Sequence, residues 1–370
     1  MYRLPKFLNV KNNLHYNYLD IISVPAAALK AKKIFIGSIS LLAALIIYDI
    51  FTYAGFAVAG ISTDLLYEAF GLFPIQLTGP ETMAGKLIYY AGIALGALAV
   101  LTGMTAIGII DIEKFRGNQF CTALQAMKFA RSRIKQLFMS ILTIVLFIGF
   151  IVLLGVLVGL LARIPYLGEL IYSVFFFFPN FIISLVTVLV IFVLFTGIFV
   201  MPSAVAADRA GETFNSILGT FSTAIRQPLR WAGYSIYTLI AAKVAGFVFA
   251  YVCFRAVQFM KIITTFGGGE KIEGLIGSGL AQLPINSDLA AFTFNLFPGV
   301  NFSFHISRLI TVEPESGLFA VLMAISLFMI FLIIWGYMLS VISTGQTYAY
   351  VIIRKIREGY FITDEEPLIK

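Results

Sequence analysis

Apolar positions along this chain gather into six long runs separated by shorter polar segments. Each run holds about 20 or more predominantly apolar residues, the length that an α-helix needs to cross a hydrocarbon core of roughly 30 Å. The predicted spans cover residues 34–57, 87–110, 137–161, 174–202, 231–252 and 318–341. The pattern therefore predicts an all-α membrane protein with about six transmembrane helices in three hairpins.

Composition supports the same class of protein. Hydrophobic residues make up 60% of the chain and charged residues only 12%, and the mean hydropathy is +0.94. A soluble globular fold needs a larger share of charged surface than this, so the composition excludes it. Four consecutive phenylalanines at 175–178, followed by Pro179, are typical of an aromatic belt at the membrane interface. We therefore expect the fourth helix to begin slightly after residue 174.

The basic residues predict the orientation. The chain has 26 Lys and Arg residues and a formal net charge of +7. Most of them lie before the first span, in the link after the second, after the fourth and after the sixth. The positive-inside rule places those segments, and both termini, in the cytoplasm. The positive charge is thus explained by topology, and nucleic acid is not an expected partner.

A short pattern occurs twice with a spacing of 94 residues. Gly117-x-x-Phe120-x-x-Ala123-Leu124-x-x-Met127 corresponds to Gly211-x-x-Phe214-x-x-Ile217-Leu218-x-x-Phe221. Apolar positions at i, i+3, i+4 and i+7 indicate an amphipathic helix. Both copies precede a span on the predicted cytoplasmic side, where such a helix lies in the plane of the interface. A chance match between two apolar helices is the alternative.

A weaker third copy precedes the first span, and the chain then reads as three units. Each unit is a cytoplasmic interfacial amphipathic helix followed by a membrane hairpin, with boundaries at 1–110, 111–206 and 207–370 in one integral membrane domain. The third unit includes a predicted long outer loop at 253–317 and a cytoplasmic C-terminal tail. Basic residues beside these helices suit contact with the headgroups of membrane lipids. The residues expected there are Lys30, Lys32, Lys33, Arg131, Arg133, Lys135, Arg226 and Arg230.

Glycine patterns predict packing faces and a hinge. Gly92-x-x-x-Gly96 and Gly155-x-x-x-Gly159 have the spacing that lets two membrane helices approach closely, although this spacing is common in apolar sequence. The run at 267–269 is followed by Glu and Lys but lacks the spacing of a phosphate-binding loop. We interpret that run as a hinge.

Residues for catalysis or metal binding are scarce. The two cysteines, Cys121 and Cys253, are expected on opposite sides of the membrane, which argues against a disulfide. The two histidines, His15 and His305, are also predicted on opposite sides, so they cannot form a metal or haem site. The sequence has no nucleophile elbow. We therefore expect no enzyme activity, no cofactor and no metal.

Two charges lie inside predicted spans. Asp49 and Lys243 are each about 18–22 Å from the inner boundary, so they are at similar depth. An unpaired charge there costs about 2.5–3.5 kcal/mol on insertion scales. These residues are interpreted as a structural ion pair, as two side chains that reach the interface separately, or as a coupling site for protons or substrate. Hydroxyl and amide residues at 340–347 are expected to bond to their own helix or a neighbouring one.

Three stretches resemble uncharacterised multi-pass membrane proteins common in planctomycete-type bacteria. They are Met201-Pro202-Ser203-Ala204-Val205-Ala206 continuing to Phe214, Arg226-Gln227-Pro228-Leu229-Arg230, and Tyr348-x-x-Val351-Ile352-Ile353-Arg354. The resemblance runs from the second span to the C-terminus and is weakest in the outer loops. It implies a location in the bacterial inner membrane, but no established activity and no functional residues.

Two functions follow from these observations. The first is a non-catalytic integral membrane subunit or scaffold of a larger assembly with other membrane protein subunits. The second is a permease or lipid-handling transporter with a charged site near the midplane, since transporters often combine internal repeats with such a site. No two spans carry clear Gly or Pro interruptions at corresponding positions, and this favours the scaffold.

Overall fold

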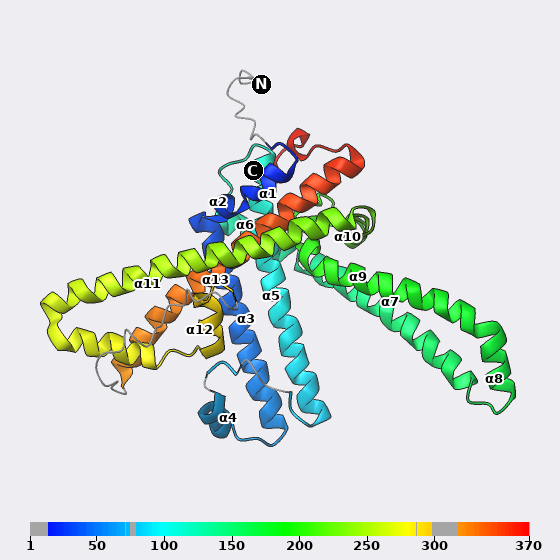
Figure 1. Ribbon diagram of the computed structural model, residues 1–370, viewed down its shortest axis with the longest axis horizontal. Helices are drawn as coiled ribbons and strands as arrows, with labels where there is room; N and C mark the ends of the chain where they lie inside the picture. The colour runs from blue at the N-terminus through cyan, green and yellow to red at the C-terminus, as the bar shows by residue number, and fades with distance from the viewer. Residues whose placement is uncertain (1–13, 71, 75–78, 286, 298–316, 370) are drawn as a thin grey trace. The chain divides into compact units, whose positions relative to one another are not determined.

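The computed structural model describes residues 14–70, 72–74, 79–285, 287–297 and 317–369. All regular elements in this part of the chain are helical (Figure 1). The first half contains α1 (Tyr18–Ile22), α2 (Val24–Ala28), α3 (Ala31–Val58), α4 (Thr63–Phe70), α5 (Met83–Phe115), α6 (Ala123–Ser132) and α7 (Ile134–Leu161). The second half contains α8 (Leu167–Ile171), a π-helical turn (Tyr172–Phe176), α9 (Phe177–Ala207), α10 (Thr213–Arg226), α11 (Pro228–Ala281), α12 (Ser287–Phe294), α13 (Leu318–Glu358) and a 3₁₀ turn (Ile362–Asp364).

Six of the described helical segments are long and apolar enough to cross a membrane. They are α3, α5, α7, the segment Leu167–Ala207 that includes α9, α11 and α13. Each contains one of the six predicted spans, which confirms an all-α multi-pass membrane protein. The helical segment of the fourth span begins earlier than expected, at Leu167, and a π-helical turn at Tyr172–Phe176 joins α8 to α9 within it.

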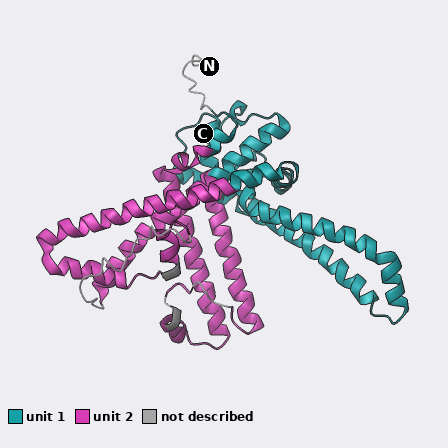
Figure 2. Cartoon of the chain, viewed as in Figure 1, with its two compact units in different colours: residues 1–21, 108–235, 345–370 teal, residues 22–107, 236–344 magenta. Residues whose placement is uncertain are grey.

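The chain forms two compact units, coloured separately in Figure 2. Unit 1 consists of residues 1–21, 108–235 and 345–370, and unit 2 of residues 22–107 and 236–344. Neither unit is continuous in sequence, so the division differs from the predicted boundaries near residues 110 and 206. The second predicted unit, 111–206, lies wholly within unit 1. The first and third predicted units are each divided between the two compact units.

Unit 1 is organised around α7, α9 and α10. Helices α7 and α9 lie side by side, and α10 packs on both (Figure 1). The contact between α9 and α10 uses small side chains. A Cβ at Gly197 would lie 3.3 Å from the Thr220 side chain, and the Thr220 hydroxyl lies 3.4 Å from the sulfur of Met201. Small residues at this contact allow α10 to sit close to α9.

Unit 2 contains an aromatic core. The rings of Phe254, Phe294 and Phe331 meet edge to face, with centroids 4.5 to 5.6 Å apart, and belong to α11, α12 and α13. Edge-to-face pairs add stability beyond the buried area. Helices α3 and α13 approach closely at Gly37 and Gly336, because a Cβ at Gly37 would collide with the Gly336 backbone.

Residues 253–281, which were expected to belong to an outer loop, are helical. Helix α11 continues past the predicted end of the fifth span, and its backbone is non-helical only at Gly269 (φ 59°, ψ −152°). Glycine adopts a positive φ without the steric cost that other residues meet. Gly269 is therefore the hinge that the sequence predicted, and it separates two helical segments. Residues 298–316 of the predicted loop, including His305, lie outside the described residues.

The two glycine pairs behave differently. A Cβ at Gly92 would collide with Phe51, and one at Gly96 would lie 3.2 Å from the Ala44 carbonyl oxygen, so this pair lies against α3. Nothing lies within 4 Å of a Cβ built at Gly155 or Gly159. The first pair marks a helix contact within the chain, as its spacing predicts, and the second marks none among the described residues.

Candidate functional site

Asp49 lies on α3 in the interior of the first span. Its Oδ1 atom and the Thr52 hydroxyl are buried, and both lack a hydrogen-bond partner among the described residues. The two residues are three positions apart, so they share one face of the helix. An unsatisfied buried polar atom costs about 1–3 kcal/mol. This pair is therefore an unusual feature of an otherwise apolar span.

Lys243 lies on α11 and bonds to α12 instead of Asp49. Its ammonium group donates a hydrogen bond to the backbone oxygen of Phe292 and lies 3.8 Å from the centroid of the Phe292 ring. A carbonyl dipole and an aromatic face both stabilise a cation in a site of low polarity. No ion pair joins Asp49 and Lys243 in the described structure. Of the three interpretations of these residues, the ion pair is therefore not formed.

The predicted headgroup contacts fall into two groups. Arg131, Lys135, Arg226 and Arg230 are exposed, and Lys30 and Lys32 are half-buried. Lipid contact by these residues stays a prediction.

The prediction is wrong for Lys33, whose side chain is fully buried. Its ammonium group donates to the Ala27 carbonyl oxygen at 3.0 Å and to the Thr344 hydroxyl at 2.9 Å. Arg133 is half-buried, and its guanidinium donates to the backbone oxygen of Arg209 at 3.1 Å. Its main role is therefore to hold the turn before α10.

The polar residues of α13 bond to neighbouring helices, as expected. In unit 2, the Ser340 hydroxyl donates to Ala28 and the Ser343 hydroxyl donates to Met104, both at backbone oxygens. In unit 1, the Gln346 amide group accepts from the Trp231 indole and donates to the Ser235 hydroxyl, and Thr347 bonds to Ser203. All five α13 residues at these positions, including Thr344, are buried.

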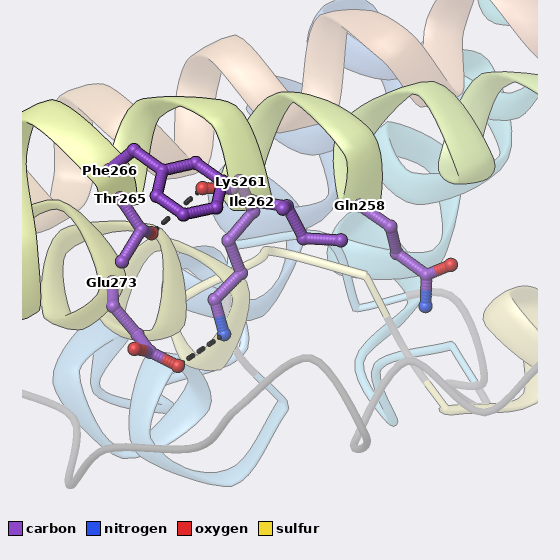
Figure 3. Close-up of a pocket in the computed structure, with 6 residues that line it drawn as sticks. All are labelled: Gln258, Lys261, Ile262, Thr265, Phe266 and Glu273. Carbon is purple, nitrogen blue, oxygen red and sulfur yellow. Dashed lines mark hydrogen bonds and ion pairs between the residues drawn. The ribbon is translucent and has the colours of Figure 1, made fainter.

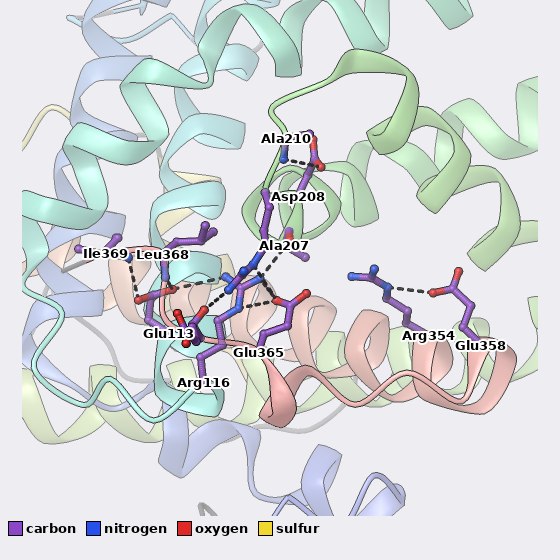
Figure 4. A network of polar contacts seen from close by, with 12 residues as sticks. Glu113, Arg116, Ala207, Asp208, Ala210, Arg354, Glu358, Glu365, Leu368 and Ile369 are labelled. Atoms are coloured by element: carbon purple, nitrogen blue, oxygen red, sulfur yellow. Dashed lines mark hydrogen bonds and ion pairs between the residues drawn. The ribbon is translucent and has the colours of Figure 1, made fainter. Parts of the chain in front are cut away.

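A buried charge network in unit 1 attaches the C-terminal tail to the end of α5 (Figure 4). The side chains of Glu113 and Arg116 are both fully buried and lie 3.4 Å apart. Arg116 also binds Glu365, with 2.7 Å between Nε and Oε2. Glu113 accepts hydrogen bonds from the backbone N–H groups of Leu368 and Ile369. Buried charges need such partners, because an uncompensated one costs several kcal/mol.

The same tail lines an arginine-rich pocket of about 570 Å³ in unit 1. The walls come from the end of α9, the turn before α10, one face of α10, the end of α13 and Glu365. Its charged residues are Arg209, Arg226, Arg354, Arg357, Asp208, Glu358 and Glu365. Guanidinium groups stay protonated at any physiological pH and present several donors in a fixed plane. These guanidinium groups are therefore suited to bind anions.

A second pocket, of about 530 Å³, lies in unit 2 where α11 reverses (Figure 3). Lys261 and Glu273, on the two segments joined through Gly269, form an ion pair of 2.9 Å. Ile262, Thr265 and Phe266 contribute to the wall. The ion pair joins the two segments of α11, so its evident role is to hold the reversal in place.

The network around Arg116 was not found from the sequence. The local signal is present, because Glu113 and Arg116 are three residues apart at the predicted inner end of the second span. Glu365 lies 249 positions away from Arg116, and nothing local indicates that it returns to this point. The described residues contain no cluster of three His, Cys, Asp or Glu side chains placed to hold a metal ion.

Comparison with protein families, curated proteins and solved structures finds no match to this chain.

Proposed function

We propose that the chain is a non-catalytic integral membrane subunit or scaffold of a larger membrane assembly. The observation that carries the proposal is the use of its buried polar groups. Ser340, Ser343 and Lys33 tie helices together in unit 2, and Glu113 and Arg116 hold the tail in unit 1. Satisfied buried polar groups rigidify a structure and specify one arrangement of its helices. This is what a platform for other subunits requires.

The chemistry of the arginine-rich pocket favours binding over catalysis. General acid–base catalysis needs a group whose pKa lies near the working pH, whereas an arginine is always charged. Such a pocket can hold and orient an acidic partner on the predicted cytoplasmic side. The proposed location is the bacterial inner membrane with both termini in the cytoplasm, in agreement with the distribution of Lys and Arg.

We further propose that α6 and α10 lie in the membrane interface. Phe120 and Leu124 are 90% and 75% exposed, and their counterparts 94 residues later, Phe214 and Leu218, are 65% and 50% exposed. Large exposed apolar side chains beside basic residues are typical of helices that lie at the headgroup boundary. Phe120 lies just before α6, and Leu124, Phe214 and Leu218 lie on α6 and α10, so both segments carry the side chains that this position requires.

Spin labels at the two phenylalanine positions test this arrangement. Both native cysteines are replaced by serine, and labels are introduced by Phe120→Cys and Phe214→Cys. In liposomes, these labels are expected to be more accessible to oxygen than to a water-soluble nickel complex. A label at the exposed Asn215, introduced by Asn215→Cys, serves as the matched control and is expected to show the opposite preference. Equal nickel accessibility at all three positions would place the helices in water.

The scaffold proposal is tested by extraction of the protein from its native membrane in a mild detergent. Separation on a native gel and mass spectrometry of the co-migrating proteins then identify any subunits. Stoichiometric co-migration with other membrane proteins is the expected result. Migration alone, as a monomer or homo-oligomer, contradicts the scaffold proposal and favours transport.

A permease or lipid-handling transporter is the second candidate, favoured by the unpartnered atoms of Asp49 and Thr52 in the interior of a span. Substrate or proton sites in transporters use such groups. If the chain transports, Asp49→Asn and Lys243→Met should lower flux into liposomes by at least tenfold. Thr187→Val is a suitable control, since Thr187 lies in another span and its hydroxyl donates to the Ile183 carbonyl oxygen of its own helix. Unchanged flux in both variants rules out a coupling role for these two residues.

A further inference from the structure

The arginine-rich pocket of unit 1 has too few free carboxylates to neutralise its guanidinium groups. Glu358 serves two of them, with Arg354 at 3.0 Å and Arg357 also in contact. Glu365 is likewise shared, between Arg209 at 3.5 Å and the buried Arg116. Glu113 compensates Arg116, so Glu365 is left for Arg209, whereas Glu358 alone cannot compensate both Arg354 and Arg357. The ion pairs that line the pocket therefore leave an excess of positive charge there.

The remaining carboxylate is occupied by neutral donors. Asp208 accepts hydrogen bonds from the Gln136 side chain at 2.7 Å and from the backbone N–H groups of Ala210 and Glu212. Arg226, at the end of α10, is exposed and has neither an ion pair nor a hydrogen bond with any described residue. The pocket thus has a guanidinium group that is free to bind a ligand.

A hydroxyl donor is also available in this pocket. The Tyr350 side chain is only 5% exposed and lines the pocket, yet its hydroxyl has no hydrogen-bond partner among the described residues. Gly219 leaves space beside it, because a Cβ at that position would lie 3.0 Å from the hydroxyl oxygen. The hydroxyl can therefore donate a hydrogen bond to a ligand in the pocket.

We propose that this pocket binds a phosphate group, with Arg226 and the Tyr350 hydroxyl as direct donors and Arg357 beside them. A guanidinium fork matches the oxygens of a phosphate, and a charge-assisted bond of this kind is about twice as strong as a neutral one. The apolar side chain of Leu218 also lines the pocket. The phosphate can therefore come from free inorganic phosphate or from the headgroup of an anionic lipid.

The test uses the full chain, purified in detergent and stripped of lipid. Binding is measured by isothermal titration with three probes, namely inorganic phosphate, dioctanoyl phosphatidic acid and a short polyglutamate peptide. Saturable binding of either phosphate probe supports the proposal, and a stronger response to the phosphatidic acid identifies lipid as the source. Binding of the polyglutamate alone would assign the pocket to an acidic protein segment and overturn the proposal.

Variants then locate the binding. Arg226→Gln is expected to weaken binding of the phosphate probe about tenfold or more, in line with a lost charge-assisted hydrogen bond, and Tyr350→Phe by a smaller factor. Arg230→Gln is the matched control, because Arg230 is also exposed but does not line the pocket. Equal loss in Arg226→Gln and Arg230→Gln would indicate non-specific attraction and overturn the site.

Correct folding of the variants is checked by their thermal unfolding in detergent. Arg226 has no partner to lose among the described residues, so its replacement is expected to leave the unfolding temperature unchanged. The phosphate site does not rest on the scaffold proposal. Co-migrating subunits and bound phosphate are separate observations, and either can fail while the other holds.

Discussion

Helices α6 and α10 follow the same sequence pattern, yet they begin differently. Both end at corresponding positions, Ser132 and Arg226, which are 94 residues apart. The next helices, α7 and α11, begin with the same offset, at Ile134 and Pro228. However, α6 begins at residue 123, which corresponds to residue 217 in the second copy. Helix α10 begins four residues before that position, at Thr213.

The different starts have a local cause. Thr122 caps α6 in a capping box with Gln125, in which each side chain bonds to the backbone N–H of the other residue. At α10, the N-cap residue Glu212 makes no side-chain cap bond. There the Asp208 side chain accepts from the Glu212 N–H at 2.8 Å and holds the preceding turn. Identical apolar spacing thus predicts a common helix end, but the capping residues decide where each helix begins.

The buried faces differ as well. Helix α6 buries two alanines, Ala126 and Ala130. Helix α10 buries five small or hydroxyl residues along its face, namely Ser216, Gly219, Thr220, Thr223 and Ala224. This face packs on α7 and α9, and another part of α10 lines the arginine-rich pocket. The two copies thus share their apolar spacing, but the second buries a longer face and also lines the arginine-rich pocket.

The largest expected effect comes from breaking the network that places the C-terminal tail beside α10. Arg116→Met leaves Glu113 and Glu365 without their buried partner, and the free energy of unfolding should fall by about 3–5 kcal/mol. Arg131→Met on the exposed surface of α6 should change it by less than about 0.5 kcal/mol. Unfolding in detergent, followed by circular dichroism, measures both. Equal stability of the two variants would contradict the proposed role of the network.

A smaller effect on the unfolding free energy is expected at the glycines that begin the two copies of the repeated pattern. Gly117 and Gly211 have φ angles of +94° and +77°, and alanine in this region costs about 1–2 kcal/mol. A Cβ at Gly211 would also collide with the Arg133 guanidinium, whereas the space around Gly117 is open. Gly211→Ala should therefore lower the unfolding free energy by about 1 kcal/mol more than Gly117→Ala, through loss of the Arg133 hydrogen bonds.

The unfolding temperatures of these two variants, measured side by side in one detergent, check that order. If Gly117→Ala proves the more damaging substitution, the contact between Arg133 and the turn at 208–211 has little energetic weight.

The smallest effect concerns the helix caps. Thr122→Ala removes the side-chain cap of α6 and should cost about 1 kcal/mol. Glu212→Ala at the corresponding end of α10 removes no side-chain cap and should cost less than about 0.5 kcal/mol. Amide hydrogen exchange in the first turn of each helix measures the local effect, which should be faster only in α6. Faster exchange at the start of α10 in Glu212→Ala would show that Glu212 stabilises that end after all.

The sequence by itself determined the membrane class, the six spans and the hinge at Gly269. These features depend on the length and period of apolar runs and on the conformational freedom of glycine, which are properties of neighbouring residues. The same local reasoning found the paired glycines Gly117 and Gly211, both of which adopt a positive φ. It also predicted that the polar residues at 340–347 of α13 bond to their own helix or a neighbouring one.

Only the tertiary structure decided which distant segments meet. Lys33 was expected at the lipid surface but is buried against Thr344, 311 positions away, and Lys243 bonds to Phe292 instead of Asp49. Glu113, Arg116 and Glu365 likewise come together through the return of the C-terminal tail. A charge near the end of a span has the same local pattern whether lipid or another helix lies beside it. Its partner is chosen by long-range packing, which no local period encodes.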